Sequence, residues 1–371
     1  MKFNIEREII LKGLKKTQGV AEKSPVVPLA ASLLIEAEEG KIVIRATNFE
    51  VGIITEHIAN VQRKGKAVID ARKTFEIFKE LPAGESHIEK KENGWIEISH
   101  EKNILFNISG VAEEEFPKVE IEEKMDFSEV CARGILDLIR STIYATSYDR
   151  TRGALMGILV EKKEGTIRMV ATDGHRLALA EREILKGESF DLKKNVVIPE
   201  RGAREIKRMV EEMEEDEKVR IGFGEKSIIF KAEEETLVIR LIDAEFPDYS
   251  KVIPEGSKKS VVLKRKELVE SLRRVELVAD EETKAVKLSF EGGKLEITSR
   301  KIGFGDAREE MDIDYGGEHV EMGLNGKYIM DILNALDDEE VFFGINDEKT
   351  PILVKGKGRE NVLAVIMPIA L

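Results

Sequence analysis

The sequence predicts an α+β protein in which one domain occurs three times. Two kinds of apolar helical window recur in the same order along the 371 residues. The first kind lies at Ile5–Ala21, Val130–Thr146 and Leu263–Ala279. The second kind lies at Ile69–Leu81, Ile198–Val210 and Leu324–Leu336. Each copy then closes on a large apolar residue followed by proline, at Phe116-Pro117, Phe246-Pro247 and Met367-Pro368.

The spacing of these landmarks, about 125 residues, is that of an independent domain, because solenoid and propeller repeats are much shorter. We therefore expect three domains, each with its own core. Polar stretches at 120–126 and 254–260 have the composition of exposed linkers. The predicted domains span residues 1–122, 123–258 and 259–371.

Each copy is predicted to contain a helix, then strands, then a second helix and further strands. Apolar residues spaced by three and four, such as Ile135, Ile139 and Ile143, place one face of a helix on a core. Helices are expected at 7–16, 71–80, 128–142, 200–210, 264–275 and 325–335. Strands that follow a glycine turn are expected at 41–46, 166–171 and 294–299, and a hairpin at 226–232 and 236–242.

Composition limits the class of protein. No apolar run approaches the roughly 20 residues that cross a bilayer, and the first residues lack the apolar core of a signal peptide. The single cysteine, Cys131, rules out an intrachain disulfide and fits a reducing cytoplasm. It falls in a predicted helix, where we expect a buried and inert thiol. Charged residues make up 35% of the chain, a composition typical of heat-adapted proteins.

Positive charge is concentrated on the predicted helices, although the chain carries a net charge of −13. The six helices together carry +9, so the remaining residues carry −22. One interpretation is that Lys and Arg, as good helix formers, simply solvate outer helix faces. The other is that a basic surface on an acidic protein contacts nucleic-acid phosphates without reading sequence. Repetition in all three copies favours the second interpretation.

Signals for catalysis are weak. The chain has no Gly-rich phosphate loop and no nucleophile elbow, and its five histidines have no partner at metal-ligand spacing. We predict no metal and no cofactor. The segment Ala171–Leu177 contains Asp173 and His175, which could form an acid–base pair. The matching segments Ala46–Gly52 and Ser299–Gly305 do not keep this pair, so a binding role must be considered beside catalysis.

The same loop, Ala-Thr-Asp-Gly-His-Arg-Leu-Ala at 171–178, resembles the bacterial sliding clamps, the β subunits of DNA polymerase III. Glu245–Tyr249 and Val365–Ile369 match the same family, and the resemblance covers the full chain. It implies a non-enzymatic homodimeric ring of six similar domains, with helices lining a central hole and sheets outside. Such a ring would encircle duplex DNA, contact only its backbone and tether the replicative DNA polymerase.

In this family the polymerase and the clamp loader dock short peptides in a pocket between the middle and last domains. The matching positions would supply an apolar slot and several polar groups. They are Leu155, Thr172, Gly174, His175, Arg176, Leu177, Pro247, Val252, Asn325, Tyr328, Val365 and Met367.

The resemblance also implies DNA contacts and a head-to-tail contact between subunits. The positions that match DNA contacts are Lys23, Ser24, Lys73, Asp149, Arg150, Arg152, Gly153 and Ala154. The subunit contact is implied at Phe106 in the first domain and at Leu277 and Val278 in the third. Two identical contacts of this kind close a dimeric ring.

Two other hypotheses remain open at the level of sequence. One is an enzyme, for example a hydrolase, that acts through Asp173 and His175. The other is a monomeric scaffold of three domains that binds acidic peptides through its basic helices and does not encircle DNA.

Overall fold

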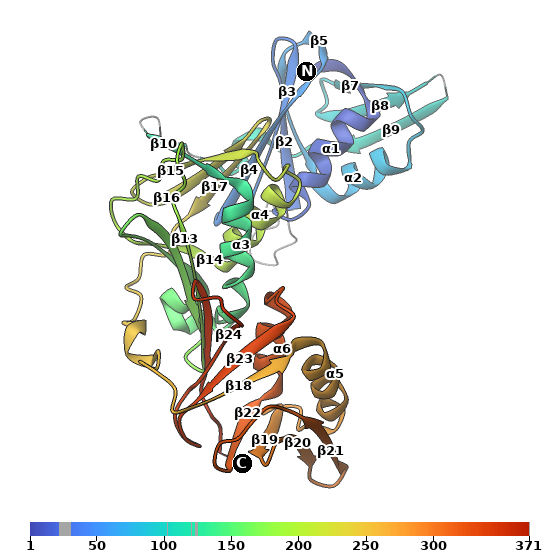
Figure 1. Ribbon diagram of the computed structural model, residues 1–371. Helices are drawn as coiled ribbons and strands as arrows, with labels where there is room; N and C mark the ends of the chain where they lie inside the picture. Colours follow the sequence, from blue (N-terminus) through green and yellow to red (C-terminus); the bar gives the residue numbers. More distant parts are fainter. Residues whose placement is uncertain (22–30, 102, 120, 123–124, 371) are drawn as a thin grey trace. The chain divides into compact units, whose positions relative to one another are not determined.

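The structure is a computed structural model that describes residues 1–21, 31–101, 103–119, 121–122 and 125–370 (Figure 1). The chain forms two compact units. The first unit comprises Met1–Arg133, Gly187–Asp191 and Arg201–Leu241. The second comprises Gly134–Lys186, Leu192–Glu200 and Ile242–Leu371. Each unit contains an eight-stranded antiparallel sheet and one smaller antiparallel sheet.

The first unit contains strands of the first and second sequence copies, and its large sheet combines strands of both. Its strands are β1 (Lys2–Glu6), β2 (Ser32–Ala37), β3 (Lys41–Thr47), β4 (Val51–Ile58), β5 (Asn60–Arg63), β6 (Gly65–Asp70), β7 (Glu85–Lys90), β8 (Trp95–His100), β9 (Ile104–Ser109), β10 (Phe127–Cys131), β15 (Lys218–Phe223), β16 (Ser227–Ala232) and β17 (Glu235–Arg240). The large sheet has the order β10-β15-β16-β17-β4-β3-β2-β6, and the small one β5-β1-β7-β8-β9.

The second unit repeats this construction with strands of the second and third copies. Its strands are β11 (Gly157–Lys163), β12 (Thr166–Thr172), β13 (Arg176–Glu183), β14 (Val196–Pro199), β18 (Lys259–Lys264), β19 (Ala285–Glu291), β20 (Lys294–Lys301), β21 (Gly305–Asp312), β22 (Val320–Asn325), β23 (Glu340–Ile345), β24 (Ile352–Gly356) and β25 (Val362–Ile366). The large sheet has the order β14-β11-β12-β13-β25-β24-β23-β18, and the small one β21-β20-β19-β22.

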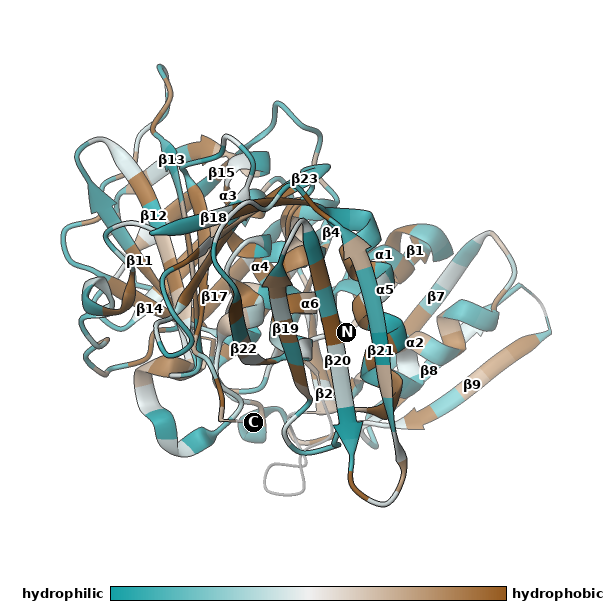
Figure 2. Ribbon diagram, turned by 60° about the horizontal axis from the view of Figure 1, so that its bottom comes forward, coloured by the Kyte–Doolittle hydropathy of each residue, from teal (hydrophilic) through white to brown (hydrophobic). Residues whose placement is uncertain are grey.

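Each large sheet therefore contains a seam where strands of successive copies pair. At the first seam β4 pairs with β17, with Gly52 opposite Val238. At the second seam β13 pairs with β25, with Leu177 opposite Val365. The two small sheets lack such a seam among the described residues, so β9 and β21 each lie at an edge. Along β20, which Figure 2 labels, the buried Leu295 and Ile297 alternate with the less buried Lys294, Glu296 and Thr298.

The helices are α1 (Arg7–Thr17), α2 (Ala71–Glu80), α3 (Ala132–Arg140), α4 (Glu200–Glu211), α5 (Arg265–Val275) and α6 (Gly326–Ala335). Two of them begin at a side-chain cap. The Lys73 amide donates to Asp70 Oδ1 at 2.7 Å at the start of α2, and the Tyr328 amide donates to Asn325 Oδ1 at 3.2 Å at the start of α6. Residues spaced by three and four, such as Leu268 and Leu272, are fully buried.

The predicted α+β fold of three tandem copies is confirmed, but one predicted helix begins too early. Residues 128–131 belong to β10, which pairs with β15, and helix α3 begins only at Ala132. Ser128 and Val130 are buried while Glu129 is exposed, a period of two that the helical pattern of the following residues concealed. Cys131 accordingly ends a strand and is half-buried, so the prediction of a buried helical cysteine was wrong.

His57 on β4 is expected to make the stability of the protein depend on pH. His57 is 4% exposed, and no described residue hydrogen bonds to its Nε2, because α1 crosses so closely at Gly13 that a Cβ there would lie 2.3 Å from this atom. Burial, with smaller contributions from Lys12 and Lys16, lowers the pKa of His57 although Glu234 opposes this. As the pH falls, the imidazole is therefore protonated in the unfolded chain before it is protonated in the folded chain. The free energy of unfolding should be highest above pH ~6.5 and should decrease on acidification.

We expect His57→Leu to flatten the pH profile of urea unfolding between pH 7 and 5, where the wild-type protein should lose up to about 2 kcal/mol. The exposed His319, replaced by glutamine, is the matched control and should keep the wild-type slope. Identical slopes for the wild type and His57→Leu would contradict this prediction.

Among the described residues, no helix is long and apolar enough to cross a membrane.

Candidate functional site

The loop between β12 and β13 is held by two side chains that hydrogen bond to its own backbone. Thr172 Oγ1 donates to the carbonyl of Arg176 at 2.6 Å and accepts from the amide of Gly174 at 3.1 Å. Asp173 Oδ1 accepts from the amides of His175 and Arg176 at 2.9 and 3.0 Å. Gly174 has a φ of +87°, which a residue without Cβ adopts at little cost. The segment is therefore a rigid turn that presents its tip outward.

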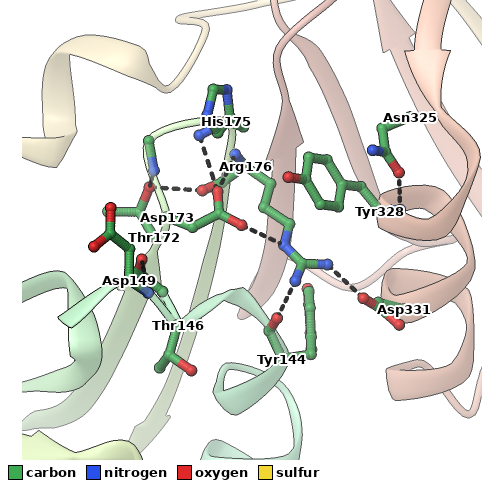
Figure 3. Close-up of polar contacts among 12 residues, drawn as sticks. Tyr144, Thr146, Asp149, Thr172, Asp173, His175, Arg176, Asn325, Tyr328 and Asp331 are labelled. Atoms are coloured by element: carbon green, nitrogen blue, oxygen red, sulfur yellow. Dashed lines mark hydrogen bonds and ion pairs between the residues drawn. The ribbon is translucent and has the colours of Figure 1, made fainter. Parts of the chain in front are cut away.

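Arg176 connects this turn to the last sequence copy (Figure 3). Its side chain is buried, with the whole residue 5% exposed. Nε donates to Asp173 Oδ2 at 3.0 Å, Nη1 donates to Asp331 Oδ2 at 2.6 Å, and Nη2 donates to the carbonyl of Tyr144. The guanidinium also lies 4.3 Å from the ring centre of Tyr328. All three nitrogens thus have partners within the protein, and Arg176 positions the loop.

The aromatic rings around Arg176 stay neutral at ordinary pH. Desolvation raises the pKa of Tyr144, with the nearby Arg176 charge acting in the opposite direction. Desolvation also raises the pKa of Tyr328, and the carboxylate of Asp173 adds to this. Figure 3 shows Tyr328 beside the Arg176 side chain, with Asn325 at the start of the same helix. Of these two residues predicted from the resemblance, Tyr328 lies next to the Arg176 side chain, and Asn325 lies beyond Tyr328 (Figure 3).

Apolar residues of the predicted site form a cluster on the second seam. Ala154, Leu177 and Val365 are buried in one core with Leu159, Val170, Leu179 and Val197. Half-buried residues cover it, and they are Ile242, Phe246, Tyr249, Ile253, Leu353 and Leu363. The Met367 amide donates to the carbonyl of His175 at 2.9 Å and its side chain is 37% exposed. Val252 and Pro247 are exposed and Leu155 is half-buried.

Sequence reasoning missed several residues of this site. Asp331 and Tyr144 complete the contacts of Arg176, and Phe246 and Tyr249 cover the apolar cluster. Phe246 belongs to the closing landmark of the second copy, so the repeat itself carried a signal for it. Asp331 lies 155 positions from Arg176, and no local pattern links the two.

The geometry does not form the acid–base pair that the sequence left open. The Asp173 carboxylate contacts two backbone amides and the Arg176 guanidinium, and it receives the backbone N–H of His175 rather than the imidazole. Figure 3 shows the His175 ring directed away from this carboxylate. Asp173 therefore stabilises the conformation of the loop. Within the described residues, no group of three or more His, Cys, Asp or Glu side chains is arranged to hold a metal.

The candidate DNA-contact residues 149–154 form a second loop beside the first. Asp149 Oδ1 accepts from the amide and hydroxyl of Thr151 at 2.9 and 2.7 Å, and these bonds lower the pKa of its carboxyl. Arg152 Nη1 donates to the carbonyl of Asp173 at 2.6 Å, which links the two loops. Gly153 has a φ of +51° and Ala154 is buried, so Arg150 and Arg152 are the exposed cations of this loop.

The other candidate contacts lie elsewhere. Lys73 is exposed in the first turn of α2, 3.0 Å from Glu76. Lys23 and Ser24 lie outside the described residues. Phe106 is half-buried on the edge strand β9. Leu277, 80% exposed, and Val278, half-buried, lie in the short helix η6 (Glu276–Val278) next to the edge strand β21.

Comparison with known proteins agrees with this architecture over the whole chain. The N-terminal, central and C-terminal domain profiles of the DNA polymerase III beta subunit match residues 1–120, 130–248 and 250–370, respectively. The chain belongs to the DNA polymerase III beta subunit family. It is a sliding clamp, as the three tandem clamp domains predict.

Members of this family resemble the present chain over its full length. The beta sliding clamp of Pseudomonas aeruginosa is 30% identical over 379 residues, covering 100% of both chains. That of Chlamydia muridarum is 31% identical and covers 100% of this chain and 99% of its own. The crystal structure of the Pseudomonas aeruginosa beta subunit superposes with a TM-score of 0.92 at 30% identity, and that from Thermotoga maritima with 0.90 at 26%. Coverage is 100% of both chains for the former, and 100% and 99% for the latter.

Proposed function

We propose that this sliding clamp is a ring-shaped homodimer that encircles duplex DNA without sequence specificity and tethers the replicative polymerase. The observation that carries the proposal is the pair of open strand edges, β9 and β21. Each large sheet joins the last strand of one four-stranded half to the third strand, in chain order, of another, as β17 to β4 and β25 to β13. By the repeat, β9 corresponds to β17 and β25, and β21 corresponds to β4 and β13.

The pairing that the repeat leaves unmade is therefore β9 with β21 of a second copy. An open edge is a template for such pairing. Phe106 on β9 and Leu277 with Val278 beside β21 would then bury apolar surface against each other. Two identical head-to-tail contacts would close a ring of six domains. We place the domains at 1–122, 123–258 and 259–371.

Charge supports DNA in the hole of this ring. The six helices as bounded in the structure carry a net +8, so the rest of the chain carries −21. Cations on helices and a surrounding acidic surface would hold the phosphate backbone weakly and interchangeably, which permits sliding. Lys23, Ser24, Lys73, Arg150 and Arg152 are the proposed contacts, while Asp149, Gly153 and Ala154 shape the loop that carries two of them.

The apolar cluster of the second unit is the proposed dock for short peptides of polymerase and clamp loader. The exposed Met367 and Val252 and the half-buried Leu155 offer apolar surface near the buried Leu177 and Val365. A sliding clamp of Pseudomonas aeruginosa has been solved bound to griselimycin, so a relative of this chain takes up a ligand. The protein would work in the cytoplasm, without chemistry of its own, and its charge-rich composition suits a heat-adapted cell.

Loading of the protein onto circular DNA tests whether it encircles the duplex as a closed ring. Labelled protein, a bacterial clamp loader and ATP are incubated with nicked circular duplex, and bound protein is separated by gel filtration in high salt. We expect the protein to remain on the circle and to leave when one restriction cut linearises it, because a closed ring can slide off an end. Equal retention on circular and linear DNA, or no retention on either, would contradict encirclement and favour the monomeric scaffold.

A further inference from the structure

The loop between β3 and β4 repeats the construction of the loop between β12 and β13. Thr47 Oγ1 donates to the carbonyl of Val51 at 3.0 Å and accepts from the amide of Phe49 at 3.0 Å. Asn48 Oδ1 accepts from the amides of Glu50 and Val51 at 3.1 and 2.8 Å. These are the bonds that Thr172 and Asp173 make in the other loop, so the chain builds the same turn at both seams.

The surrounding strands repeat as well. Val238 lies opposite Gly52 on the first seam, as Val365 lies opposite Leu177 on the second. The Arg240 amide donates to the carbonyl of Glu50 at 2.8 Å, as the Met367 amide does to His175 at 2.9 Å. Arg240 therefore holds the place of Met367. The first seam presents the backbone of the proposed peptide dock with different side chains.

A cavity of about 620 Å³ lies at this first seam. Its floor is apolar: Val238 is buried, and Val119 packs so closely on Gly52 that a Cβ there would lie 2.6 Å from Val119 Cγ1. Phe49 lies in the wall and is 54% exposed, with a φ of +73° where the other loop has glycine. A bulky residue held in the left-handed region is unusual and marks a candidate functional position. The cavity has the size and mixed lining of a ligand site.

The positively charged side chains that line the cavity lack ion-pair partners in the described part of the chain. Lys118, Lys226 and Arg240 are exposed lining residues that form no ion pair within the described part of the chain. Of the lining carboxylates, Glu122 accepts from the Ser227 hydroxyl at 3.1 Å, and Glu50 also has a partner within the protein. With Glu225, three carboxylates and three cations line the cavity, but within the described part of the chain none of the three cations has a carboxylate at ion-pair distance. The carboxylates of a ligand would supply the ion pairs that these cations lack.

We infer that the first seam is a second peptide-docking site, which takes a short acidic peptide with an aliphatic or aromatic anchor. The anchor contacts Phe49, Val119 and Val238, and the acidic residues face Lys118, Lys226 and Arg240. The inference goes beyond the proposed function, from which it borrows only that the second seam binds peptides. Two docks of different chemistry on one chain allow two partners to occupy the clamp at once. The third copy lacks this turn, because β20 and β21 continue as a hairpin from Ser299 opposite Ala307 to Lys301 opposite Gly305.

Methyl NMR of the full-length protein tests this site. The probe is the end-blocked pentapeptide Asp-Asp-Leu-Phe-Asp, with Lys-Lys-Leu-Phe-Lys and Asp-Asp-Ser-Ser-Asp as comparison peptides. Methyl groups of Val119 and Val238 report on the first seam, and those of Leu177 and Val365 on the second. We expect the acidic apolar peptide to shift the Val119 and Val238 signals saturably, and both comparison peptides to shift them far less.

Two sets of variants identify the contacts. Lys226→Glu with Arg240→Glu should weaken binding at Val238 about tenfold and leave Val365 unaffected. Phe49→Gly should weaken it too without loss of stability, since glycine suits the same φ. The matched control is Lys162→Glu with Lys163→Glu, two exposed lysines outside the cavity, which should leave binding at Val238 unchanged.

The outcomes are distinguishable from those of the proposed function. Shifts confined to Leu177 and Val365, or no shift at Val238 with millimolar peptide, would overturn the second site and leave the first dock in place. Shifts at Val238 that the control variant weakens equally would show non-specific attraction and also overturn it. Shifts at Val238 without any at Val365 would support this inference and count against the proposed dock.

Discussion

Replacing Leu277 by glutamate is expected to separate the proposed dimeric ring into single chains of 41.8 kDa. Leu277 is 80% exposed and lies with Val278 in η6, next to the open edge β21. In the proposed contact it packs against the partner near Phe106, so a carboxylate there would lose its water without gaining a counter-ion. We expect a loss of about 2–4 kcal/mol at each of the two contacts, enough to raise the dimer dissociation constant by at least about a thousandfold.

Light scattering after size exclusion measures this change directly, together with small-angle scattering for the central hole. The unfolding free energy of the single chain should remain unchanged, because Leu277 contributes little to its own unit. Ile58→Glu is the control, since Ile58 is 78% exposed at the end of β4 and the strand that follows it, β5, lies at the opposite edge of the small sheet from β9. A variant Leu277→Glu that still elutes as a dimer at low micromolar concentration would contradict the edge-to-edge ring.

Replacing Arg176 by methionine is expected to destabilise the second unit by about 3–5 kcal/mol. The change removes three hydrogen bonds from a residue that is 5% exposed and leaves the Asp331 carboxylate without its cation. The loop tip would lose its tie to the helix that carries Tyr328 and Asn325. We therefore expect peptide affinity at the second seam to fall as well, although the guanidinium nitrogens all have partners within the protein.

Urea unfolding and peptide titration measure the two effects. Arg359→Met is the matched control, because the Arg359 pair with Asp338 at 3.1 Å is partly exposed and should contribute less than about 1 kcal/mol. Arg176→Lys keeps the charge without the planar fork and should give an intermediate loss. If Arg176→Met and Arg359→Met lowered the free energy of unfolding equally, the buried contacts of Arg176 would contribute no more to stability than a partly exposed ion pair.

Local patterns predicted most of the secondary structure of this chain. The helices at 71–80 and 200–210, and the strands that begin at 41, 166 and 294, agree with the structure to within a few residues. They could be predicted because each depends on periodicity and turn chemistry within a short window. The error at 128–131 arose where a strand runs directly into a helix, so that two periods overlap in one apolar stretch.

The sequence by itself determined the threefold repeat, the positive charge of the helices and the resemblance from which the peptide dock was predicted. Only the tertiary structure decided how the copies join. Strand pairing links residues far apart in the chain, as Leu177 with Val365, and no local period encodes such partners. The same holds for the buried contacts of Arg176, for the open edges β9 and β21, and for the cavity at the first seam. Each of these depends on which surfaces are covered, and burial is settled only when distant segments pack.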